Sequence, residues 1–487
     1  MASLLDPSLS RRHRPLAWLG LGTVVAALAA AALSLAGCGT GTPRPVAELM
    51  ALPDVPMVVV FVPGTTGTEL RNRQTGELIW GTGRALLRPR DGGYSLALPL
   101  NPEDPRRQRL EPADLLQRLS LFGVLTKAVY GPVLGWLEDH GYPRGDLDAP
   151  RPGERLFTFA YDWRRSNVDS ARKLARHLEQ LRRDLEQPRL EVALICQSNG
   201  ASICRYAMKY GDAGLAEATA GERSLPEGIH FTRLILVGTA NGGSLRVLRL
   251  LDRGRTYLHP VGRHWSAEAL FTFPGLYQDL PAYNPQPFID AAGNELQDDI
   301  FDPRTWRRYE LGIYRPEVQQ RLDRLGDESL FGDAAARDAY LDRVLGEARQ
   351  FHRLLHRDPE GYAPPPIHLI QNIYTPTAHR SLVVRERDGD WHALYTGDRA
   401  LSAYPELQDR LSAPGDEHAT RESQLWLSPR EQAMLQGEPL HIRGGHFEMI
   451  LHPAAKRRLT EILRLQGPAP AKSESAPASP GDDSALP

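Results

Sequence analysis

The chain has 487 residues and a formal net charge of −2, with 41% hydrophobic and 24% charged residues. This composition is typical of a globular protein, and the balanced charge gives no basic field that would favour nucleic acid as a partner. The length allows one large domain with insertions, or two or three domains. The 3 cysteines, Cys38, Cys196 and Cys204, form neither a Cys-x-x-Cys pair nor a His/Cys cluster, so we expect no disulfide framework and no metal site.

The N-terminus has the pattern of a secretory signal. A basic stretch at residues 11–14 precedes an apolar run at residues 16–36. Leu35-Ala36-Gly37 stands directly before Cys38 and resembles a bacterial lipobox, in which the cysteine is lipidated and becomes the mature N-terminus. We therefore expect a signal peptide at residues 1–37 and an exported lipoprotein of the bacterial cell envelope, membrane-anchored on the periplasmic or extracellular face. The alternative is an uncleaved membrane anchor, because the apolar run approaches the length of a spanning helix.

The first half of the remaining chain alternates between strand and helix patterns. Met57–Val62 is a continuous apolar run bounded by proline and glycine, which predicts a fully buried strand of a parallel sheet. A helical pattern lies near Leu115–Leu137, and Leu156–Ala160 is expected to be the next strand. Apolar residues then recur at helical spacing over Val168–Leu185, which predicts an amphipathic helix against the sheet. This order is typical of an α/β protein with a mostly parallel sheet.

A serine stands at the junction of a strand and a helix within Val192–Ile203. The pattern around Ser198 is Cys-x-Ser-x-Gly, close to the Gly-x-Ser-x-Gly of a nucleophile elbow, with Cys196 in place of the first glycine. In an elbow the serine occupies a strained turn that projects its hydroxyl from the sheet edge, as in α/β hydrolases. Cysteine is only modestly larger than alanine or glycine, so the turn could survive. The alternative is a buried strand that meets a helix beside an incidental serine.

Two backbone amides are candidates for stabilising a negatively charged oxygen near Ser198. The amide of Asn199 follows the serine at a helix N-terminus, where the helix dipole favours negative charge. The second donor of an α/β hydrolase comes from the turn after the first core strand. In that turn the amide of Thr65 is the first choice and that of Thr66 the second, whereas a plain strand–helix turn is the alternative.

The second half of the chain interrupts this alternation and then returns to it. Four further elements are expected after the strand at Leu234–Val237: a strand at Ile367–Ile373, a hairpin of Leu382–Arg385 with Trp391–Tyr395, a short strand at Leu440–Arg443 and a helix at Pro453–Leu465. The predicted organisation is a tether at residues 38–56, an α/β-hydrolase domain at 57–466 with insertions at about 70–150 and a cap at about 245–365, and a disordered tail at 467–487.

A serine hydroxyl needs an imidazole to take its proton and a carboxylate to orient that imidazole. In α/β hydrolases these groups follow the serine in the order acid, then histidine. His446 fits the loop after the last strand, whereas His441 lies within the strand and His452 at the start of the helix. Asp416 and Asp398 each follow a glycine in loops before that strand. We favour Asp416 because it lies closer to His446, with Asp398 as the alternative acid.

These segments together resemble the lecithin:cholesterol acyltransferase family in its bacterial lipoprotein form, over about residues 57–465. The residues that carry the resemblance are Val62–Gly67, Leu78–Gly81, the Tyr-Asp-Trp-Arg signature at Tyr161–Arg164, the elbow at Ser198, Gly238–Ser244, Phe273–Pro281, Gly415–Ser423 and His446. The acid loop at Gly415–Ser423 is the main reason to rank Asp416 above Asp398.

The resemblance implies a serine enzyme that acts on lipid acyl esters, with Ser198, Asp416 and His446 as its catalytic residues and an acyl-enzyme intermediate. Transfer of the acyl group to water would make it a lipase or phospholipase, and transfer to a lipid alcohol would make it an acyltransferase. The triad is common to both, so the sequence does not separate them. Neither a metal nor an organic cofactor is implied.

Three departures from the family pattern leave other functions open. The elbow reads Cys-Gln-Ser-Asn-Gly, Ala240 stands where proline is usual, and Glu417-His418-Ala419 replaces the usual residues after the acid. The alternatives are a catalytically impaired, lipid-binding envelope lipoprotein and a serine amidase or peptidase on the same fold. Acyl chain length, acceptor, inner or outer membrane and oligomeric state are not indicated by the sequence.

Overall fold

The fold of the chain is given by a computed structural model. Its described residues are 57–82, 91–121, 125–256, 264–385, 389 and 391–464. The predicted signal peptide at residues 1–37, the lipidation site Cys38, the tether at residues 38–56 and the tail at residues 467–487 lie outside the described residues.

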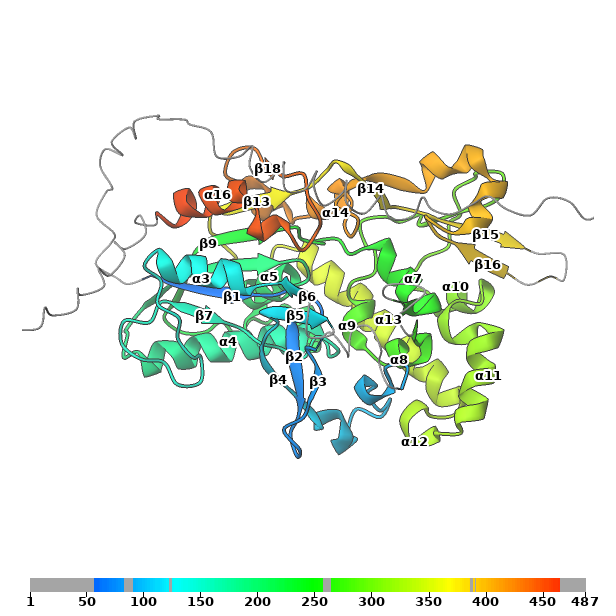
Figure 1. The fold of residues 1–487 in the computed structure, drawn as a ribbon, viewed down its shortest axis with the longest axis horizontal. Coiled ribbons are helices and arrows are strands. Elements are labelled where there is room, and N and C mark those ends of the chain that lie inside the picture. Colours follow the sequence, from blue (N-terminus) through cyan, green and yellow to red (C-terminus); the bar gives the residue numbers. More distant parts are fainter. Residues whose placement is uncertain are drawn as a thin grey trace, which may run out of the picture. The chain divides into compact units, whose positions relative to one another are not determined.

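A six-stranded parallel sheet forms the centre of the fold (Figure 1). Its strands, in spatial order, are β7 (Leu156–Thr158), β1 (Val58–Val62), β8 (Leu190–Gln197), β9 (Ile229–Val237), β13 (Ile367–Gln371) and β18 (Leu440–His441). Every neighbouring pair is parallel, so the carboxyl ends of all six strands lie at one edge. The mostly parallel sheet predicted from the apolar runs is confirmed, and this edge carries the loops that follow the strands.

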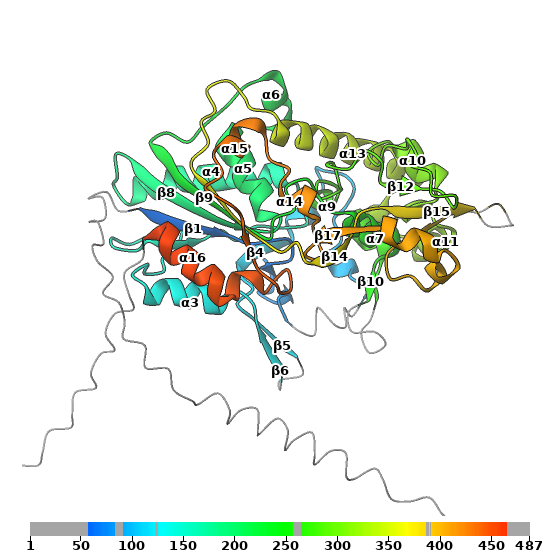
Figure 2. The same cartoon turned by 90° about the horizontal axis from the view of Figure 1, so that it is seen from above.

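Helices cover both faces of the sheet because successive side chains of a buried strand point to opposite sides. Val58, Val60 and Val62 of β1 pack in one core cluster with α4 (Asn167–Asp184) and α5 (Gly200–Tyr210). Val59 and Phe61 pack in a second cluster with α3 (Gly131–Asp139) and α16 (Pro453–Leu463). Figure 2 shows these two helix pairs on opposite sides of β1. The two apolar layers explain why the strand reads as an uninterrupted hydrophobic run.

The helical pattern predicted near Leu115–Leu137 is only partly a helix in the structure. Residues 118–121 and 125–128 are not helical but form two antiparallel strands, β5 (Arg118–Leu121) and β6 (Leu125–Ala128). Helix α3 begins only at Gly131, where Pro132 suits the first turn of a helix. The leucines at 115, 116, 119, 121 and 125 fit a helical period as well as a strand period, so their spacing alone did not discriminate. Strands β2 (Thr68–Asn72), β3 (Leu78–Trp80) and β4 (Leu110–Leu115) form a separate antiparallel sheet in the order β3-β2-β4.

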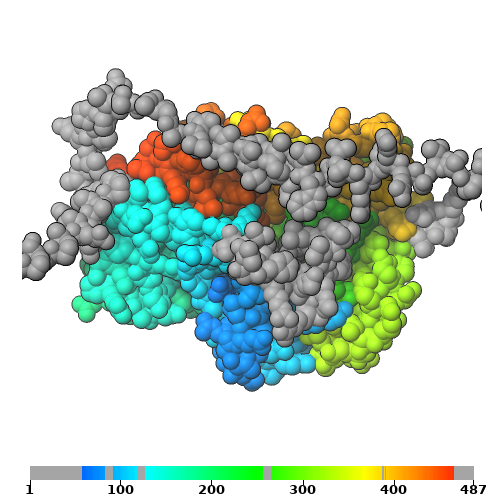
Figure 3. Space-filling model, viewed as in Figure 1, coloured from blue at the N-terminus to red at the C-terminus, as the bar shows by residue number. Residues whose placement is uncertain are grey.

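The described residues between β9 and β13 are rich in helices. They contain α7 (Leu245–Arg253), α8 (Ala267–Phe271), α9 (Pro274–Tyr277), α10 (Pro303–Arg308), α11 (Pro316–Leu325), α12 (Glu328–Phe331) and α13 (Ala334–His356). Figure 3 shows the surface of the light-green part of this segment beside the blue N-terminal insertion. The Leu100 amide donates to the Leu330 carbonyl at 3.3 Å, and Arg106 donates to the Ser329 carbonyl at 2.7 Å. The two insertions therefore contact each other.

The remaining α-helices and strands are short. They are α6 (Leu215–Ala220), α14 (Arg421–Gln424), α15 (Pro429–Ala433), β10 (Arg255–Thr256), β11 (His264–Trp265), β12 (Phe288–Ile289), β14 (Thr375–Ala378), β15 (Ser381–Arg385), β16 (Trp391–Leu394) and β17 (Ser412–Gly415). The predicted hairpin is confirmed, because β15 and β16 pair antiparallel. None of the helices in the described ranges has the length and apolar character that a membrane crossing requires.

Candidate active site

Ser198 lies in the tight turn between β8 and α5, with a φ of 53°. A positive φ is uncommon for a residue other than glycine and is a form of backbone strain that is found at nucleophile elbows. The chain around the turn is closely packed. A Cβ on Gly200 would stand 2.5 Å from the Val62 carbonyl oxygen, and one on Gly64 would stand 2.7 Å from the Ser198 Cβ. Both positions therefore need glycine, and the strand, the helix and the turn after β1 meet at the serine.

Three side chains that are distant in the sequence form one hydrogen-bonded series. The Ser198 Oγ lies 2.9 Å from the His446 Nε2, and the His446 Nδ1 lies 2.7 Å from the Asp416 Oδ2. The other Asp416 oxygen accepts hydrogen bonds from the amides of His418 at 2.9 Å and Ala419 at 2.7 Å. Because a carboxylate accepts hydrogen bonds, it orients the imidazole with Nδ1 as the donor and leaves Nε2 to accept the serine proton.

The alternative acid, Asp398, lies in a different environment. Its two oxygens each accept from an arginine at 2.8 Å, one from Arg249 and the other from Arg253. The oxygen that faces Arg253 also accepts from the Tyr395 amide at 2.9 Å. Asp398 therefore binds two cations of α7 and makes no hydrogen bond with His446, whereas Asp416 does.

The two residues whose amides are predicted to stabilise a negative charge belong to segments that adjoin the serine. Asn199 is the residue before α5, whose N-terminus faces the turn. Gly64 contacts Ser198, which brings the turn that contains Thr65 against the nucleophile. Thr66 has a φ of 68°, and its carbonyl accepts from the Trp80 indole at 2.9 Å. The roles of the Thr65 and Asn199 amides stay predictions.

His418 belongs to this site, although the sequence did not single it out as functional. Its ring is stacked on that of His446, with centroids 4.2 Å apart and an interplanar angle of 12°. Burial lowers the pKa of His418 well below its ordinary value, and the neighbouring His446 acts in the same direction. His418 is therefore an uncharged ring that supports one face of the imidazole. Its position two residues after the candidate acid was the signal that could have identified it.

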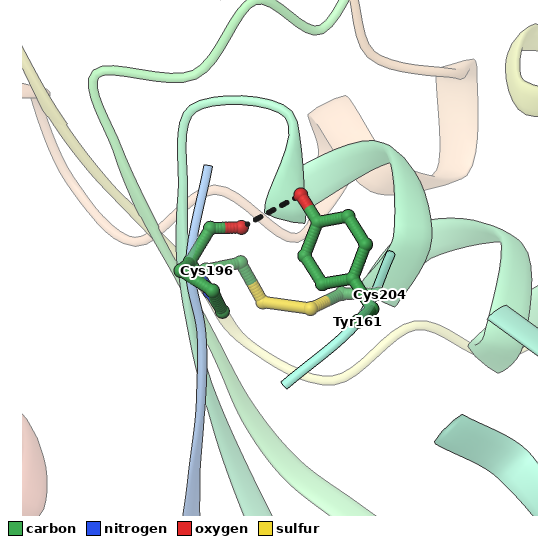
Figure 4. The surroundings of a disulfide bond; sticks show 4 residues. Tyr161, Cys196 and Cys204 are labelled. Carbon is green, nitrogen blue, oxygen red and sulfur yellow. Dashed lines mark hydrogen bonds between the residues drawn. A yellow bond between two sulfur atoms is a disulfide. The ribbon is translucent and has the colours of Figure 1, made fainter. Parts of the chain in front are cut away.

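A disulfide spans the nucleophile turn, and the prediction of no disulfide framework is wrong for this one bond. Cys196 on β8 and Cys204 on α5 are bonded, with their Cα atoms 6.8 Å apart (Figure 4). Both side chains are fully buried, and Tyr161 lies beside them. The strand–turn–helix reversal brings residues 8 apart in sequence together. Cysteine spacing could not reveal this pairing, because it depends on the reversal at the elbow.

Among the residues that the structure describes, no group of three His, Cys, Asp or Glu side chains is arranged to hold a metal ion. A cavity of about 570 Å³ lies elsewhere, and Pro281, Phe301, His352 and Trp426 are among the residues that line it. Neither Ser198, Asp416 nor His446 lines this cavity.

The parallel sheet with a serine at a strand–helix elbow defines the fold as that of an α/β hydrolase. Residues 114–273 match the family model described as Lecithin:cholesterol acyltransferase, which confirms the resemblance indicated by the motifs. The matched part includes Tyr161–Arg164 and Ser198 but ends before Asp416 and His446. At the level of the family, the match supports an acyl-ester hydrolase or acyltransferase that acts on lipids.

Several solved structures are similar to this chain. One of them is a chain in the crystal structure of the Tle4–Tli4 complex, with 12% sequence identity and a TM-score of 0.48. The similarity covers 84% of the present chain and 98% of the other. No curated protein matches the sequence.

Proposed function

We propose that the protein is a serine-dependent lipid acyl-ester hydrolase or acyltransferase in which Ser198, His446 and Asp416 are the catalytic residues. The observation that carries this proposal is the unbroken hydrogen-bonded series of these three residues, 2.9 Å from serine to imidazole and 2.7 Å from imidazole to carboxylate. Nucleophile, base and orienting carboxylate in this order are the arrangement that acyl transfer through serine requires.

In the first half of the reaction, the Ser198 Oγ attacks the ester carbonyl carbon while the His446 Nε2 takes the serine proton. Asp416 stabilises the imidazolium that results. The carbonyl oxygen becomes negatively charged and faces the amides of Asn199 and Thr65. The tetrahedral intermediate then collapses: the ester bond breaks, His446 gives its proton to the departing alcohol, and the acyl group remains on Ser198.

In the second half, His446 takes a proton from the incoming acceptor, whose oxygen attacks the acyl carbon. The bond between the acyl carbon and the Ser198 Oγ then breaks, and His446 returns the proton to the Ser198 Oγ. Water as the acceptor releases a carboxylic acid, whereas a lipid alcohol gives a new ester. Incubation of the enzyme with a phospholipid, with and without a sterol or long-chain alcohol, separates these reactions. A new ester that forms at the expense of free acid identifies an acyltransferase, and free acid alone identifies a hydrolase.

The activity is tested by labelling the full-length protein with a fluorophosphonate and mapping the modified peptide by mass spectrometry. An adduct on Ser198 that is absent from Ser198→Ala supports an activated serine. Without an adduct in a folded protein, the catalytic role of Ser198 is wrong and a lipid-binding role gains support. An amide or peptide substrate that turns over faster than any ester would instead favour an amidase or peptidase.

We also propose that the mature protein is an envelope lipoprotein anchored through Cys38, because the lipobox-like pattern precedes that residue. Mass spectrometry of the mature N-terminus tests this proposal. A lipid-modified Cys38 as the first residue supports it. A mature chain that keeps residues 1–37 contradicts it and favours the uncleaved anchor.

A further inference from the structure

Two buried polar residues follow α9, and their side chains form hydrogen bonds with two segments next to the nucleophile. Gln278 is 1% exposed and Asp279 is 8% exposed. Their turn is attached to the start of α7, because the Ser244 amide donates to the Asp279 carbonyl at 2.8 Å. Buried polar side chains are costly unless they make hydrogen bonds. The partners of these two residues therefore show what the turn stabilises.

Asp279 holds the turn that follows β1. The Thr65 hydroxyl donates to the Asp279 Oδ2 at 3.1 Å. Thr65 directly follows Gly64, which is in contact with Ser198. The carboxylate thus fixes the side chain of the residue whose backbone amide is the first candidate on this side of the nucleophile.

Gln278 is linked to Asn199, the residue after the nucleophile, through Asn167. Its Oε1 accepts from the Asn167 amide at 2.6 Å, and its Nε2 donates to the Ser166 hydroxyl at 3.0 Å. The Asn167 side chain then forms two reciprocal hydrogen bonds with that of Asn199, at 3.0 and 2.9 Å. Asn199 directly follows Ser198 and provides the other candidate amide.

We propose that Gln278 and Asp279 are positioning residues that together hold the amides of Asn199 and Thr65 in the geometry required to bind the oxyanion. This inference rests on the proposed function. The donors of an oxyanion hole must lie about 2.7–3.1 Å from the developing negative oxygen. A single turn that is hydrogen-bonded to both donor segments restrains their separation, in addition to the direct packing of the turn after β1 on the elbow. The oxyanion hole is therefore completed by the segment between β9 and β13.

Two substitutions separate the hydrogen bond of Asp279 from its charge. In Asp279→Leu the new side chain has a volume similar to that of aspartate but offers no acceptor to the Thr65 hydroxyl. The Thr65 amide should then be slightly misplaced, so kcat should fall about 10- to 100-fold while KM changes little. Asp279→Asn keeps an acceptor, and its kcat at pH 6 should approach that of the wild type. Tyr309→Phe is the control, because the Tyr309 hydroxyl donates to Asp298 at 2.6 Å, a residue of the same segment between β9 and β13 that belongs neither to this turn nor to the acid loop.

The pH profile gives a readout that a merely structural role would not move. Burial raises the pKa of Asp279 to about 7, and the Thr65 hydrogen bond offsets this only in part. Tyr161 also faces Asp279, but burial raises its pKa well above its ordinary value, so it stays neutral in this range. Above pH 7 Asp279 is negatively charged and lies next to Thr65, whose amide is proposed to bind the oxyanion. The two negative charges repel each other, so the kcat of the wild type should fall. Asp279→Asn should lack this alkaline decrease.

Gln278→Leu tests the other arm, and phosphonate labelling of each variant reports the reactivity of Ser198 separately. A lower kcat in both Leu variants, with the alkaline decrease abolished in Asp279→Asn, supports the inference. Wild-type kcat in both Leu variants, or an unchanged pH profile in Asp279→Asn, overturns it. If a Leu variant fails to fold, the profile of Asp279→Asn still decides. An unlabelled, inactive wild type overturns the proposed function and this inference with it.

Discussion

Replacement of both Cys196 and Cys204 by alanine should lower the free energy of unfolding by about 2.5 kcal/mol. A disulfide stabilises mainly by restricting the unfolded chain, with an entropy of about −2.1 − 1.5R ln n cal/mol/K for a loop of n residues. The two cysteines are 8 residues apart. This separation gives about 8.3 cal/mol/K, or about 2.5 kcal/mol at 25 °C. The loss of two buried sulfur atoms acts in the same direction.

The measurement is a urea titration of the full-length protein, followed by intrinsic fluorescence and circular dichroism without reductant. Cys38→Ala is the control and should unfold at the wild-type urea concentration, because this residue takes no part in the bond. Titration of free thiols in unfolded, unreduced protein checks that Cys196 and Cys204 are unreactive. The reasoning is refuted if the double variant and the wild type unfold at the same urea concentration, or if both thiols react.

Three further perturbations probe the site and the core. Asp416→Asn should lower kcat about 10⁴-fold, because its NH2 group can donate to the His446 Nδ1, which favours the wrong tautomer, and because it lacks the charge that stabilises the imidazolium. Asp398→Asn should leave kcat unchanged. Steady-state kinetics would contradict the assignment if the two effects were reversed. Gly64→Ala should lower kcat/KM, because its Cβ would stand 2.7 Å from the Ser198 Cβ. Gly135→Ala is the control and should keep the wild-type kcat/KM, because its Cβ would have no atom within 4 Å. The same kcat/KM in both variants would contradict the close packing around Gly64. Burial lowers the pKa of His352 to about 3, so His352 binds a proton at higher pH in the unfolded chain than in the folded one. The free energy of unfolding of the wild type should therefore decline as the pH falls below about 6.5. Urea titrations at pH 4–7 should show a shallower decline for His352→Phe, and an equally steep decline would contradict this prediction.

Local sequence patterns predicted much of the central sheet. The apolar run at Met57–Val62 became β1, and the pattern at Val168–Leu185 became α4, because burial on both faces of a strand or along one stripe of a helix restricts the residue type at each position. The same reasoning was insufficient for the segments that form β5 and β6, because the leucine spacing fits a helix as well as a strand. The pairing of these two strands determines that they are extended and not helical.

The candidate site was partly predictable for a different reason. Chain order and the loop after the last strand pointed to His446, and the structure brings it within hydrogen-bond distance of Ser198. The position of His418 close to the candidate acid was a sequence signal, but its stacking on His446 depends on how the two loops meet. The contributions of Gln278 and Asp279 could not be predicted, because they depend on which loops meet at the carboxyl edge of the sheet.

The sequence by itself determined the local features of this protein: the apolar strands, the amphipathic helices, and the glycines and serine of the elbow. These follow from backbone sterics and from hydrophobic period, which act over a few residues. Only the tertiary structure decided that Asp416 rather than Asp398 meets His446 and that Cys196 pairs with Cys204. Such contacts join residues whose separation in space is set by the packing of the whole sheet and its helices, and no short stretch of sequence specifies that packing.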